Sequence, residues 1–129
     1  PATTICAISK DRVCLGGNIM PGIRLSMEAL ESKTSKLPSV EIRATKDVVG
    51  KTTIDSIQNG LYWSNVGMIK EITSRISQEV FEGNTPLRIA TGGFSHLFDR
   101  ENLFDHVVTD LILVGIVEAL TINGYLERN

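Results

Sequence analysis

The chain has 129 residues, 42% hydrophobic and 22% charged, as expected of one soluble globular domain that buries a core without disulfide staples. The net charge is −2 and lysines and arginines do not cluster, which excludes the electrostatic footprint of a nucleic-acid-binding protein. The longest apolar run, Leu111–Val117, is far shorter than the roughly 20 residues of a membrane span, and no signal-peptide pattern is present, so we expect no membrane contact. Two cysteines cannot make a disulfide framework, so we expect a cytoplasmic, reducing location.

The first two elements are predicted to be the strands of a hairpin. β-Branched and apolar residues fill Thr3–Ser9, and the apolar pattern resumes over Arg12–Leu15 after a polar break. Gly16-Gly17 is predicted to end this hairpin. Cys6 and Cys14 could face each other across it, where we expect two buried small side chains without a redox role.

A helix and a short strand are predicted to follow. Apolar residues recur at helical spacing within Gly22–Lys33, and Pro21 suits the first turn of that helix. Farther along, Val40 and Ile42 alternate with polar neighbours. This alternation predicts a short strand between the first helix and the next one.

A long helix is predicted to begin near Thr53. Thr52 with Asp55 three residues later resembles a capping box, with Asp in place of the usual Glu or Gln, and Gly83 supplies a stop signal. So long a helix in so small a domain indicates that part of it packs on another chain. The apolar positions that define it are Ile54, Ile57, Leu61, Val66, Ile69, Ile72, Ile76 and Val80.

Two glycines of this helix, Gly60 and Gly67, lie two turns apart on one face. Two readings fit such a pair, namely close packing of a neighbouring helix and approach of a ligand to the backbone. We favour packing, because a helical face of small residues lets a second helix come near.

The last third of the chain alternates between short strands and helices. Leu87–Ala90 reads as a short buried strand that leads into Thr91-Gly92-Gly93, with a helix starting directly after it. Val107-Val108 is a further candidate strand, and Leu111–Leu126 is predicted to be the final helix, with weak points at its two glycines. We therefore predict a single α/β domain over residues 1–129.

The sequence lacks the usual catalytic constellations. His96 and His106 have no Cys or carboxylate at metal-ligand spacing and are expected to be surface histidines. Neither GxxxxGK[ST] nor GxGxxG occurs. Three glycine-bearing breaks flank predicted strands or helices, at Gly16-Gly17, Gly50–Thr53 and Thr91–Gly93, and such breaks let backbone approach an anionic ligand. Together they indicate a nucleotide or phosphate cleft.

Read together, these segments resemble the C-terminal half of a type III pantothenate kinase, within the superfamily of acetate and sugar kinases, heat-shock chaperones and actin. The patterns GGxIxPGxxxxxxAL, GxxTxxxIxxG and ATGG occur in this order and are jointly specific. The resemblance covers nearly the whole chain, through the segments PATTICAIS, LGGNIMPGIRLSMEAL, SKLPSVEI, VVGKTTIDSIQNGLYW and IATGGFSHLF.

This resemblance implies an RNase H-like lobe of the actin-like ATPase kind, with a mixed β-sheet and flanking helices. Complete family members have two such lobes, bind ATP between them and form dimers. They transfer the γ-phosphate of ATP to pantothenate in the first step of coenzyme A synthesis, with Mg²⁺ and a monovalent cation such as K⁺ or NH₄⁺. This chain would correspond to the second lobe.

Several family motifs have no counterpart in this sequence. The first phosphate loop and the glycine-x-acid-arginine segment, which supplies the catalytic base, are absent. The second phosphate loop normally reads Asp-x-Gly-Thr-Ala-Thr-Thr, and this chain begins inside it, with Pro1 at the nucleotide-binding Thr and Cys6 where an acidic residue is common. We therefore assign no catalytic and no metal-binding residue in this chain.

Other family positions are retained. Thr53 matches a Thr that reaches pantothenate, from the neighbouring subunit of the dimer. The resemblance assigns nucleotide binding to two further groups, the turn beside the phosphate cleft and the adenosine-side glycine motif. These residues are Gly16, Gly17, Thr91, Gly92 and Gly93. A structural alternative exists for each, with Thr53 as a helix N-cap and Gly92-Gly93 as a tight turn.

Two functions remain open from the sequence. The chain is either a kinase lobe or subunit that is inactive without an N-terminal lobe, or a degenerate half that acts as an interaction or transcriptional accessory protein. A truncated form or gene remnant is a third reading. The first strand and cleft side of an unpaired lobe would be exposed, so we expect a homo- or hetero-oligomer.

Overall fold

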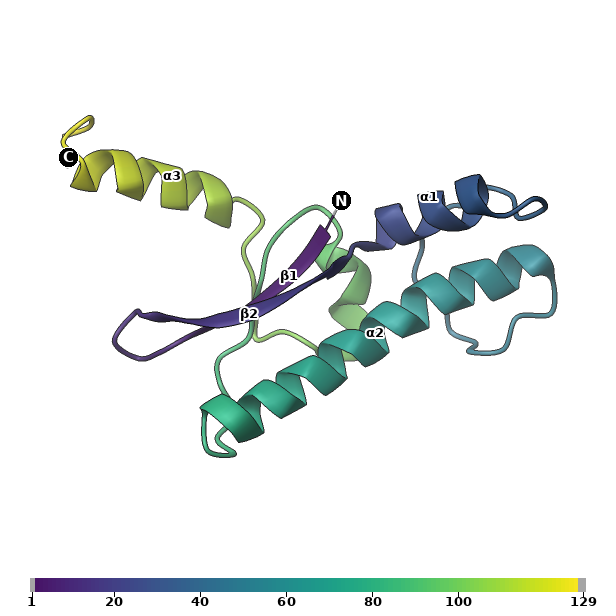
Figure 1. Cartoon of the computed structure of the whole chain (residues 1–129), viewed down its shortest axis with the longest axis horizontal. Helices are drawn as coiled ribbons and strands as arrows, with labels where there is room; N and C mark the ends of the chain where they lie inside the picture. The colour runs from purple at the N-terminus through teal and green to yellow at the C-terminus, as the bar shows by residue number, and fades with distance from the viewer. Residues whose placement is uncertain (1, 128–129) are drawn as a thin grey trace. The chain divides into compact units, whose positions relative to one another are not determined.

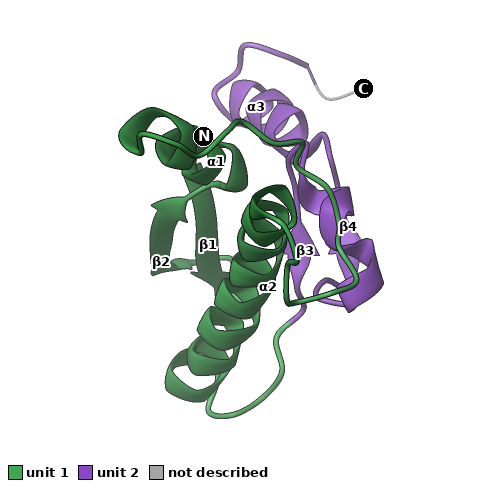
Figure 2. Ribbon diagram, turned by 90° about the vertical axis from the view of Figure 1, so that its right-hand side faces the viewer, with its two compact units in different colours: residues 1–86 green, residues 87–129 purple. Residues whose placement is uncertain are grey.

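The computed structural model describes residues 2–127 and divides into two compact units, residues 1–86 and residues 87–129, which Figure 2 colours separately. Unit 1 contains β1 (Ala2–Ile8), β2 (Cys14–Pro21), α1 (Ile23–Lys33) and α2 (Thr53–Val80), all labelled in Figure 1. Unit 2 contains β3 (Ile89–Ala90), the 3₁₀ helix η1 (Ser95–Glu101), β4 (His106–Val107) and α3 (Leu111–Ile122). The chain is thus a mixed α/β protein, as predicted, while its organisation as a single domain stays a prediction.

The hairpin is longer than the sequence suggested. β1 and β2 pair antiparallel, and Gly16 and Gly17 lie inside β2, opposite Ala7 and Cys6, so the prediction that these glycines end the hairpin was wrong. A Cβ on Gly17 would lie 2.1 Å from the Ile5 carbonyl oxygen, so close backbone approach explains this glycine within the strand.

A register shift accompanies Gly16. Ala7 pairs with Gly16 but Ile8 pairs with Cys14, so one residue of β2 bulges out of the ladder, and Gly16 has φ = 121°. The observed pairing also corrects the prediction for the cysteines. Cys6 faces Gly17 rather than Cys14, and both thiols are free and exposed instead of buried.

The first helix begins after a tight corner. Gly22 is the N-cap of α1. Pro21 is the last residue of β2, so the prediction that it belongs to the first turn of the helix was wrong. The Gly22 carbonyl accepts the Ser26 N–H at 2.9 Å, which starts the helical hydrogen-bond pattern directly at the corner.

The strand predicted at Val40 and Ile42 does not form, because residues 37–45 adopt no regular secondary structure. Side chains of α2 hold this segment instead of a neighbouring strand. Gln58 donates to the Glu41 carbonyl oxygen at 2.9 Å and accepts from Arg43 Nε at 3.1 Å. Trp63 Nε1 donates to the Asp47 carbonyl oxygen at 3.1 Å and extends the attachment along the helix.

The predicted long helix is confirmed as α2, 28 residues, which packs against α1 and β1. Thr52 is its N-cap and accepts the Asp55 N–H at 3.1 Å, as the sequence predicted. Just beyond its C-terminus, Gly83 has φ = 82° and donates its N–H to the Ser77 carbonyl. The core of unit 1 lies along one face of α2, formed by Ile57, Leu61, Tyr62, Val66 and Ile69.

The glycines around α2 differ in what surrounds them. A Cβ on Gly50 would lie 2.3 Å from the Ser56 backbone nitrogen, so the loop before α2 touches the first turn of the helix there. Apart from their chain neighbours and the backbone of their own helix, Gly60 and Gly67 have no described atom within 4 Å of a built Cβ. The neighbouring helix predicted to pack on them is therefore not part of this chain's described residues, and its presence in another chain stays a prediction.

Unit 2 is organised by an ion pair beside a short parallel sheet. β3 pairs with β4 through Ile89 with His106 and Ala90 with Val107. Arg88 and Asp105 precede these strands and form two side-chain hydrogen bonds, 2.9 and 3.2 Å long. The Arg88 N–H also donates to the Asp105 carboxylate at 2.7 Å, so one aspartate aligns both strands.

The remaining predictions for unit 2 are partly corrected. The strand predicted over Leu87–Ala90 covers only its last two residues, and Ala90 alone is buried in it. The helix after Gly93 is the 3₁₀ helix η1, and α3 ends at Ile122 rather than Leu126. His96 and His106 are exposed, as predicted. Within residues 2–127, no helix is long and apolar enough to cross a membrane.

The contrast between the glycines predicts opposite effects of adding one methyl group. Gly50→Ala should lower the free energy of unfolding by about 1–3 kcal/mol, since backbone must shift to admit the Cβ. Gly67→Ala should raise it by about 0.5–1 kcal/mol, because the site is open and alanine favours the helix. Urea unfolding followed by Trp63 fluorescence measures the free energy of unfolding of both variants. A change of the same sign in the two variants would contradict the prediction.

The ion pair of unit 2 predicts an acid-labile contact. Side-chain and backbone hydrogen bonds from Arg88 lower the pKa of Asp105 from 3.8 to about 2. A depressed carboxyl pKa stabilises the fold above the unfolded value, and this stabilisation is lost as the pH falls from about 4 through 2. NMR titration of the Asp105 carboxyl should show this pKa, and Arg88→Met should return it towards 3.8. A wild-type value near 4 would mean that the pair does not form.

Candidate functional site

Thr53 occupies the first position of α2, directly after the N-cap. The cap is Thr52, so the structural alternative that made Thr53 the N-cap was wrong. The carbonyl of Thr52 further accepts the Ser56 N–H at 2.9 Å and the Ser56 hydroxyl at 2.8 Å. With the helix start held by its neighbours, the Thr53 side chain is available for another role.

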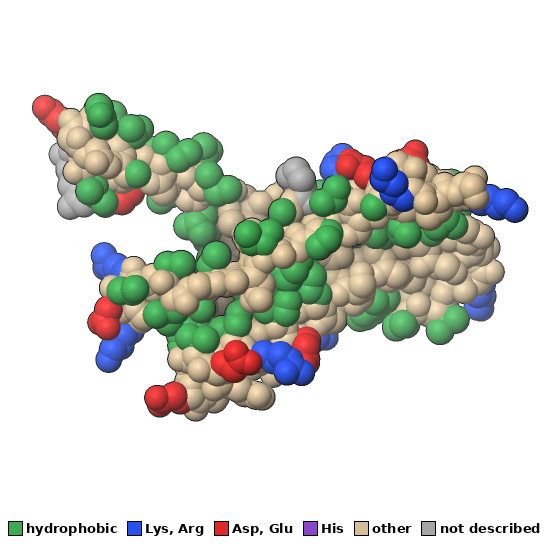
Figure 3. Space-filling model, in the orientation of Figure 1, with side chains coloured by type: hydrophobic (Ala, Val, Ile, Leu, Met, Phe, Trp, Pro, Cys, Tyr) green, Lys and Arg blue, Asp and Glu red, His purple; other side chains and the backbone are tan. Residues whose placement is uncertain are grey.

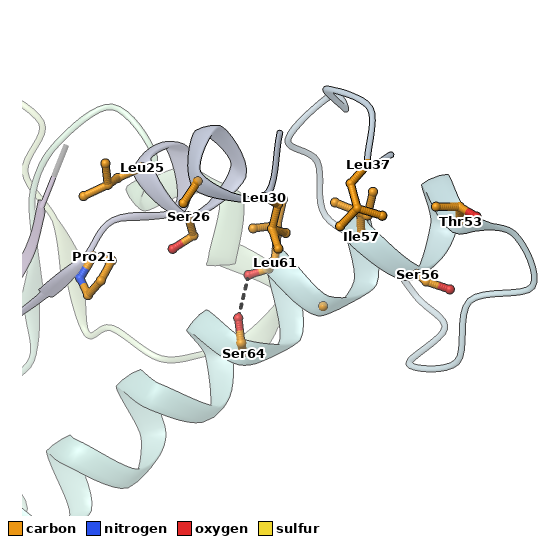
Figure 4. Close-up of a pocket in the computed structure, with 12 residues that line it drawn as sticks. Pro21, Leu25, Ser26, Leu30, Leu37, Thr53, Ser56, Ile57, Leu61 and Ser64 are labelled. Atoms are coloured by element: carbon orange, nitrogen blue, oxygen red, sulfur yellow. Dashed lines mark hydrogen bonds between the residues drawn. The ribbon is translucent and has the colours of Figure 1, made fainter. Parts of the chain in front are cut away.

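An apolar groove of about 840 Å³ lies between α1, α2 and the loop that joins them, within unit 1. Thr53 and Ser56 lie at one end and Pro21 at the other, with leucines from both helices and the loop between them (Figure 4). The residues that line the groove are Pro21, Leu25, Ser26, Ala29, Leu30, Leu37, Thr53, Ser56, Ile57, Gly60, Leu61 and Ser64.

The hydroxyls of the groove fall into two pairs. Ser56 and Ser64 donate to carbonyl oxygens of α2, at 2.8 and 3.3 Å, and Figure 4 draws the second of these bonds. Among residues 2–127, the hydroxyls of Ser26 and Thr53 form no hydrogen bond. An apolar groove with two free hydroxyls suits a ligand that is largely aliphatic and carries hydroxyl or amide groups.

Thr91, Gly92 and Gly93 form the turn between β3 and η1. Gly92 has φ = 95°, and its carbonyl accepts the Ser95 N–H at 3.2 Å and the buried Ser95 hydroxyl at 2.7 Å. A Cβ on Gly92 or Gly93 would meet no described atom within 4 Å. The turn therefore needs glycine at Gly92 for its conformation, and its outer face is open to a flat ligand.

The site residues predicted from the sequence do not all meet in one place. Thr53 lines the groove, whereas Gly16 and Gly17 are strand residues of β2 and do not line it. Thr91, Gly92 and Gly93 belong to unit 2. The roles of all six residues in ligand binding stay predictions.

The described residues do not fit the metal that the family resemblance implies. Within residues 2–127, no three His, Cys, Asp or Glu side chains gather closely enough to hold a metal ion. Asp55 lies in the first turn of α2 and does not line the groove. We therefore derive no step of any reaction through a metal ion bound by this chain alone.

Sequence reasoning proposed Thr53 as a site residue, which stays a prediction, but missed the groove that it lines. Leu30, Ile57 and Leu61 were read as parts of helical patterns, whereas the serines and the loop residue Leu37 carried no signal. The spacing Ser56, Gly60, Ser64 marks a face of small residues on α2 and would have pointed to an open side of the helix.

Comparison with known proteins decides the family. The profile of the family described as type III pantothenate kinase matches residues 1–75. The chain belongs to the type III pantothenate kinase family. The type III pantothenate kinase of Legionella pneumophila (strain Corby) is 53% identical over 122 residues, which are 95% of this chain. The type III pantothenate kinase 1 of Francisella tularensis subsp. holarctica (strain OSU18) is 52% identical over 115 residues, 89% of this chain.

The chain spans about half the length of the kinases it matches, 48% of the Legionella protein and 45% of the Francisella protein. A crystal structure of a conserved candidate Baf family transcriptional activator from Campylobacter jejuni has a TM-score of 0.65 at 22% identity. The matched region is 97% of this chain and 55% of the Campylobacter chain. This likeness shows a shared fold, and that structure likewise extends well beyond the matched part.

The neighbouring threonines Thr52 and Thr53 predict different responses to the same substitution. Thr52→Ala should lower the free energy of unfolding by about 1 kcal/mol, because the cap of α2 is lost. Thr53→Ala should change it by less than about 0.5 kcal/mol, since the side chain has no partner in the described chain. Urea unfolding of both variants tests this, and a larger loss from Thr53→Ala would contradict the assignment of the cap.

Proposed function

We propose that this chain is the second lobe, or a subunit, of a type III pantothenate kinase that transfers the γ-phosphate of ATP to pantothenate, the first step of coenzyme A biosynthesis. The observation that carries the proposal is 53% identity to a kinase of that name over 95% of this chain. We further propose that the two units form an RNase H-like lobe of the actin-like ATPase kind. The enzyme would work in the cytoplasm.

The groove is the proposed contact with pantothenate, a molecule with aliphatic, hydroxyl and amide parts. Thr53 would donate or accept a hydrogen bond through its free hydroxyl, and the leucines would contact the aliphatic part. The open turn of Thr91, Gly92 and Gly93 would lie against the adenosine of ATP. Gly16 and Gly17 would shape the strand that borders the phosphates.

We propose that the chain alone is catalytically incomplete. Phosphoryl transfer depends on positioned phosphates, charge stabilisation and a base that orients the attacking hydroxyl. The family's glycine-x-acid-arginine segment and its first phosphate loop have no counterpart here, and the second loop lacks its Asp and Gly. The other half of the enzyme would supply these groups, and with them the contacts to Mg²⁺ and the monovalent cation.

We also propose that α2 packs on a second subunit. Gly60, Ser64 and Gly67 are exposed along one face of the helix, and the first two line the groove. Small residues at this spacing allow a second helix to approach closely. Thr53 of one chain would then reach the substrate held by its partner.

An alternative is a non-catalytic half that acts as an interaction or transcriptional accessory protein. The solved structure of similar fold carries the description of a candidate transcriptional activator. At 22% identity that likeness concerns the fold alone, whereas the kinases are more than twice as similar in sequence. We therefore favour the kinase.

The deciding experiment measures ATP-dependent phosphorylation of pantothenate. This chain is assayed alone and co-expressed with the half of the Legionella kinase that it does not match. Activity only in the co-expressed sample supports the kinase proposal. Silence in both samples, with the two polypeptides shown to bind, supports the non-catalytic alternative. Activity of the chain alone contradicts the proposed incompleteness.

Thr53→Ala in the active mixture tests the groove. Loss of the hydroxyl contact should raise KM for pantothenate roughly tenfold and leave KM for ATP within about twofold, because a lost hydrogen bond costs about 1–1.5 kcal/mol. Thr73→Ala, a threonine on a later turn of α2, is the matched control. Unchanged KM for pantothenate in Thr53→Ala would remove the groove from the substrate site.

A further inference from the structure

The loop that joins α1 and α2, residues 34–52, contains no buried residue. Full burial of apolar side chains therefore does not hold it in place, and hydrogen bonds to the two helices do. At the start of the loop, the Thr34 hydroxyl donates to the Leu30 carbonyl of α1 at 2.6 Å. The same hydroxyl accepts the Leu37 N–H at 3.3 Å, so this end of the loop is attached to α1.

The attachment to α2 is made by Gln58, whose side chain is buried and only 6% exposed. Its Nε2 donates to the Glu41 carbonyl at 2.9 Å, and its Oε1 accepts from Arg43 Nε at 3.1 Å. A buried amide is normally hydrogen-bonded, because an unpaired one costs free energy. Both polar ends of Gln58 thus serve the loop, and Trp63 Nε1 adds one bond to the Asp47 carbonyl at 3.1 Å.

The groove lies between these two attachments. Figure 3 shows hydrophobic side chains along the boundary between α1 and α2, where the groove lies. Leu37 lines the groove from the loop, and it stands between Thr34, which is bonded to α1, and Glu41, which is bonded to α2. Thr53 follows the last residue of the loop and lines the same groove. The loop is therefore a brace from one helix to the other.

Gln58 acts on the groove without lining it. At 100° per residue, its side chain points about 100° away from that of Ile57, which does line the groove. An effect of Gln58 on a ligand in the groove must therefore pass through the loop that it holds.

We propose that Gln58 is a positioning residue for pantothenate, which holds the loop against α2 and thereby places the Leu37 side chain against the substrate. The proposal rests on the proposed function, because it takes the groove as the contact with pantothenate. It assigns no contact between Gln58 and the substrate, and its expected effect is on pantothenate and not on ATP.

The test replaces Gln58 with methionine, which has a similar volume but forms neither hydrogen bond. Glu41 and Arg43 are exposed, so water can bond the groups that Gln58 releases, and the variant should fold, which circular dichroism checks. Gln78→Met makes the same substitution at an exposed position of α2 and is the matched control. Each variant is assayed after co-expression with the complementary half of the Legionella kinase.

Gln58→Met should raise KM for pantothenate roughly fivefold or more and leave KM for ATP within about twofold, while the control leaves both unchanged. A merely structural role would reduce the amount of active enzyme without separating the two KM values. In the chain alone, amide hydrogen exchange of residues 34–52 should become faster in Gln58→Met, and exchange in the second half of α2 should not change.

Arg43→Met tests the same attachment from the loop, and it keeps the test decisive if Gln58→Met does not fold. It removes one of the two bonds at an exposed side chain, so KM for pantothenate should rise roughly two- to threefold. The double variant should match Gln58→Met alone, because the Arg43 bond is already lost there. Effects that multiply in the double variant would overturn the proposal.

The outcomes separate this inference from the proposed function. An active mixture in which Gln58→Met keeps its KM for pantothenate, or raises both KM values alike, overturns the role of Gln58 and keeps the kinase. Unchanged amide exchange of the loop overturns that role as well. A wild-type mixture that binds but does not phosphorylate pantothenate overturns the proposed function, and the role of Gln58 with it.

Discussion

The burial of one face of α2 is the constraint on which unit 1 depends. A 28-residue helix is stable only if it buries an apolar stripe. This helix packs against β1 and α1, and five of its apolar side chains are buried. Tyr62 is 1% exposed, at the centre of that stripe. Beside this stripe, Gly60, Ser64 and Gly67 are exposed, and Gly60 and Ser64 line the groove together with Ile57 and Leu61.

The same helix also fixes the loop that closes the groove. Residues 37–45 form no strand hydrogen bonds. Gln58 of α2 bonds the Glu41 carbonyl and the Arg43 side chain instead, and Trp63 bonds the carbonyl of Asp47, just beyond this segment. Gly50 then lies against Ser56, which sets the chain's entry into the helix and leaves Thr53 at the mouth of the groove. Packing, loop and candidate site are therefore one connected arrangement, in which a shift of the loop would move the Thr53 hydroxyl.

The parts that the sequence predicted well are those with a long, repeated signal. The apolar positions of α2 repeat over many helical turns, and its N-cap involves only Thr52 and Asp55, three residues apart. Both the helix and its cap could therefore be predicted from the sequence. The alternation of apolar and polar residues at Val40 and Ile42 was too short to show whether a partner strand exists. Gly16 and Gly17 of β2 resemble turn residues in the sequence, and only their pairing with β1 shows that they belong to a strand. The groove joins residues from two helices and a loop, a tertiary fact that no local pattern contains, although Thr53 itself was identified by family resemblance.

The exposed thiols of the hairpin have a practical consequence. Cys6 and Cys14 are free, lie on neighbouring strands that do not pair them with each other, and face solvent. Under air oxidation they can therefore crosslink different molecules more readily than each other. An oligomer observed without a reducing agent would then report covalent chemistry at the hairpin, while the same two thiols offer attachment points for fluorophores without any substitution.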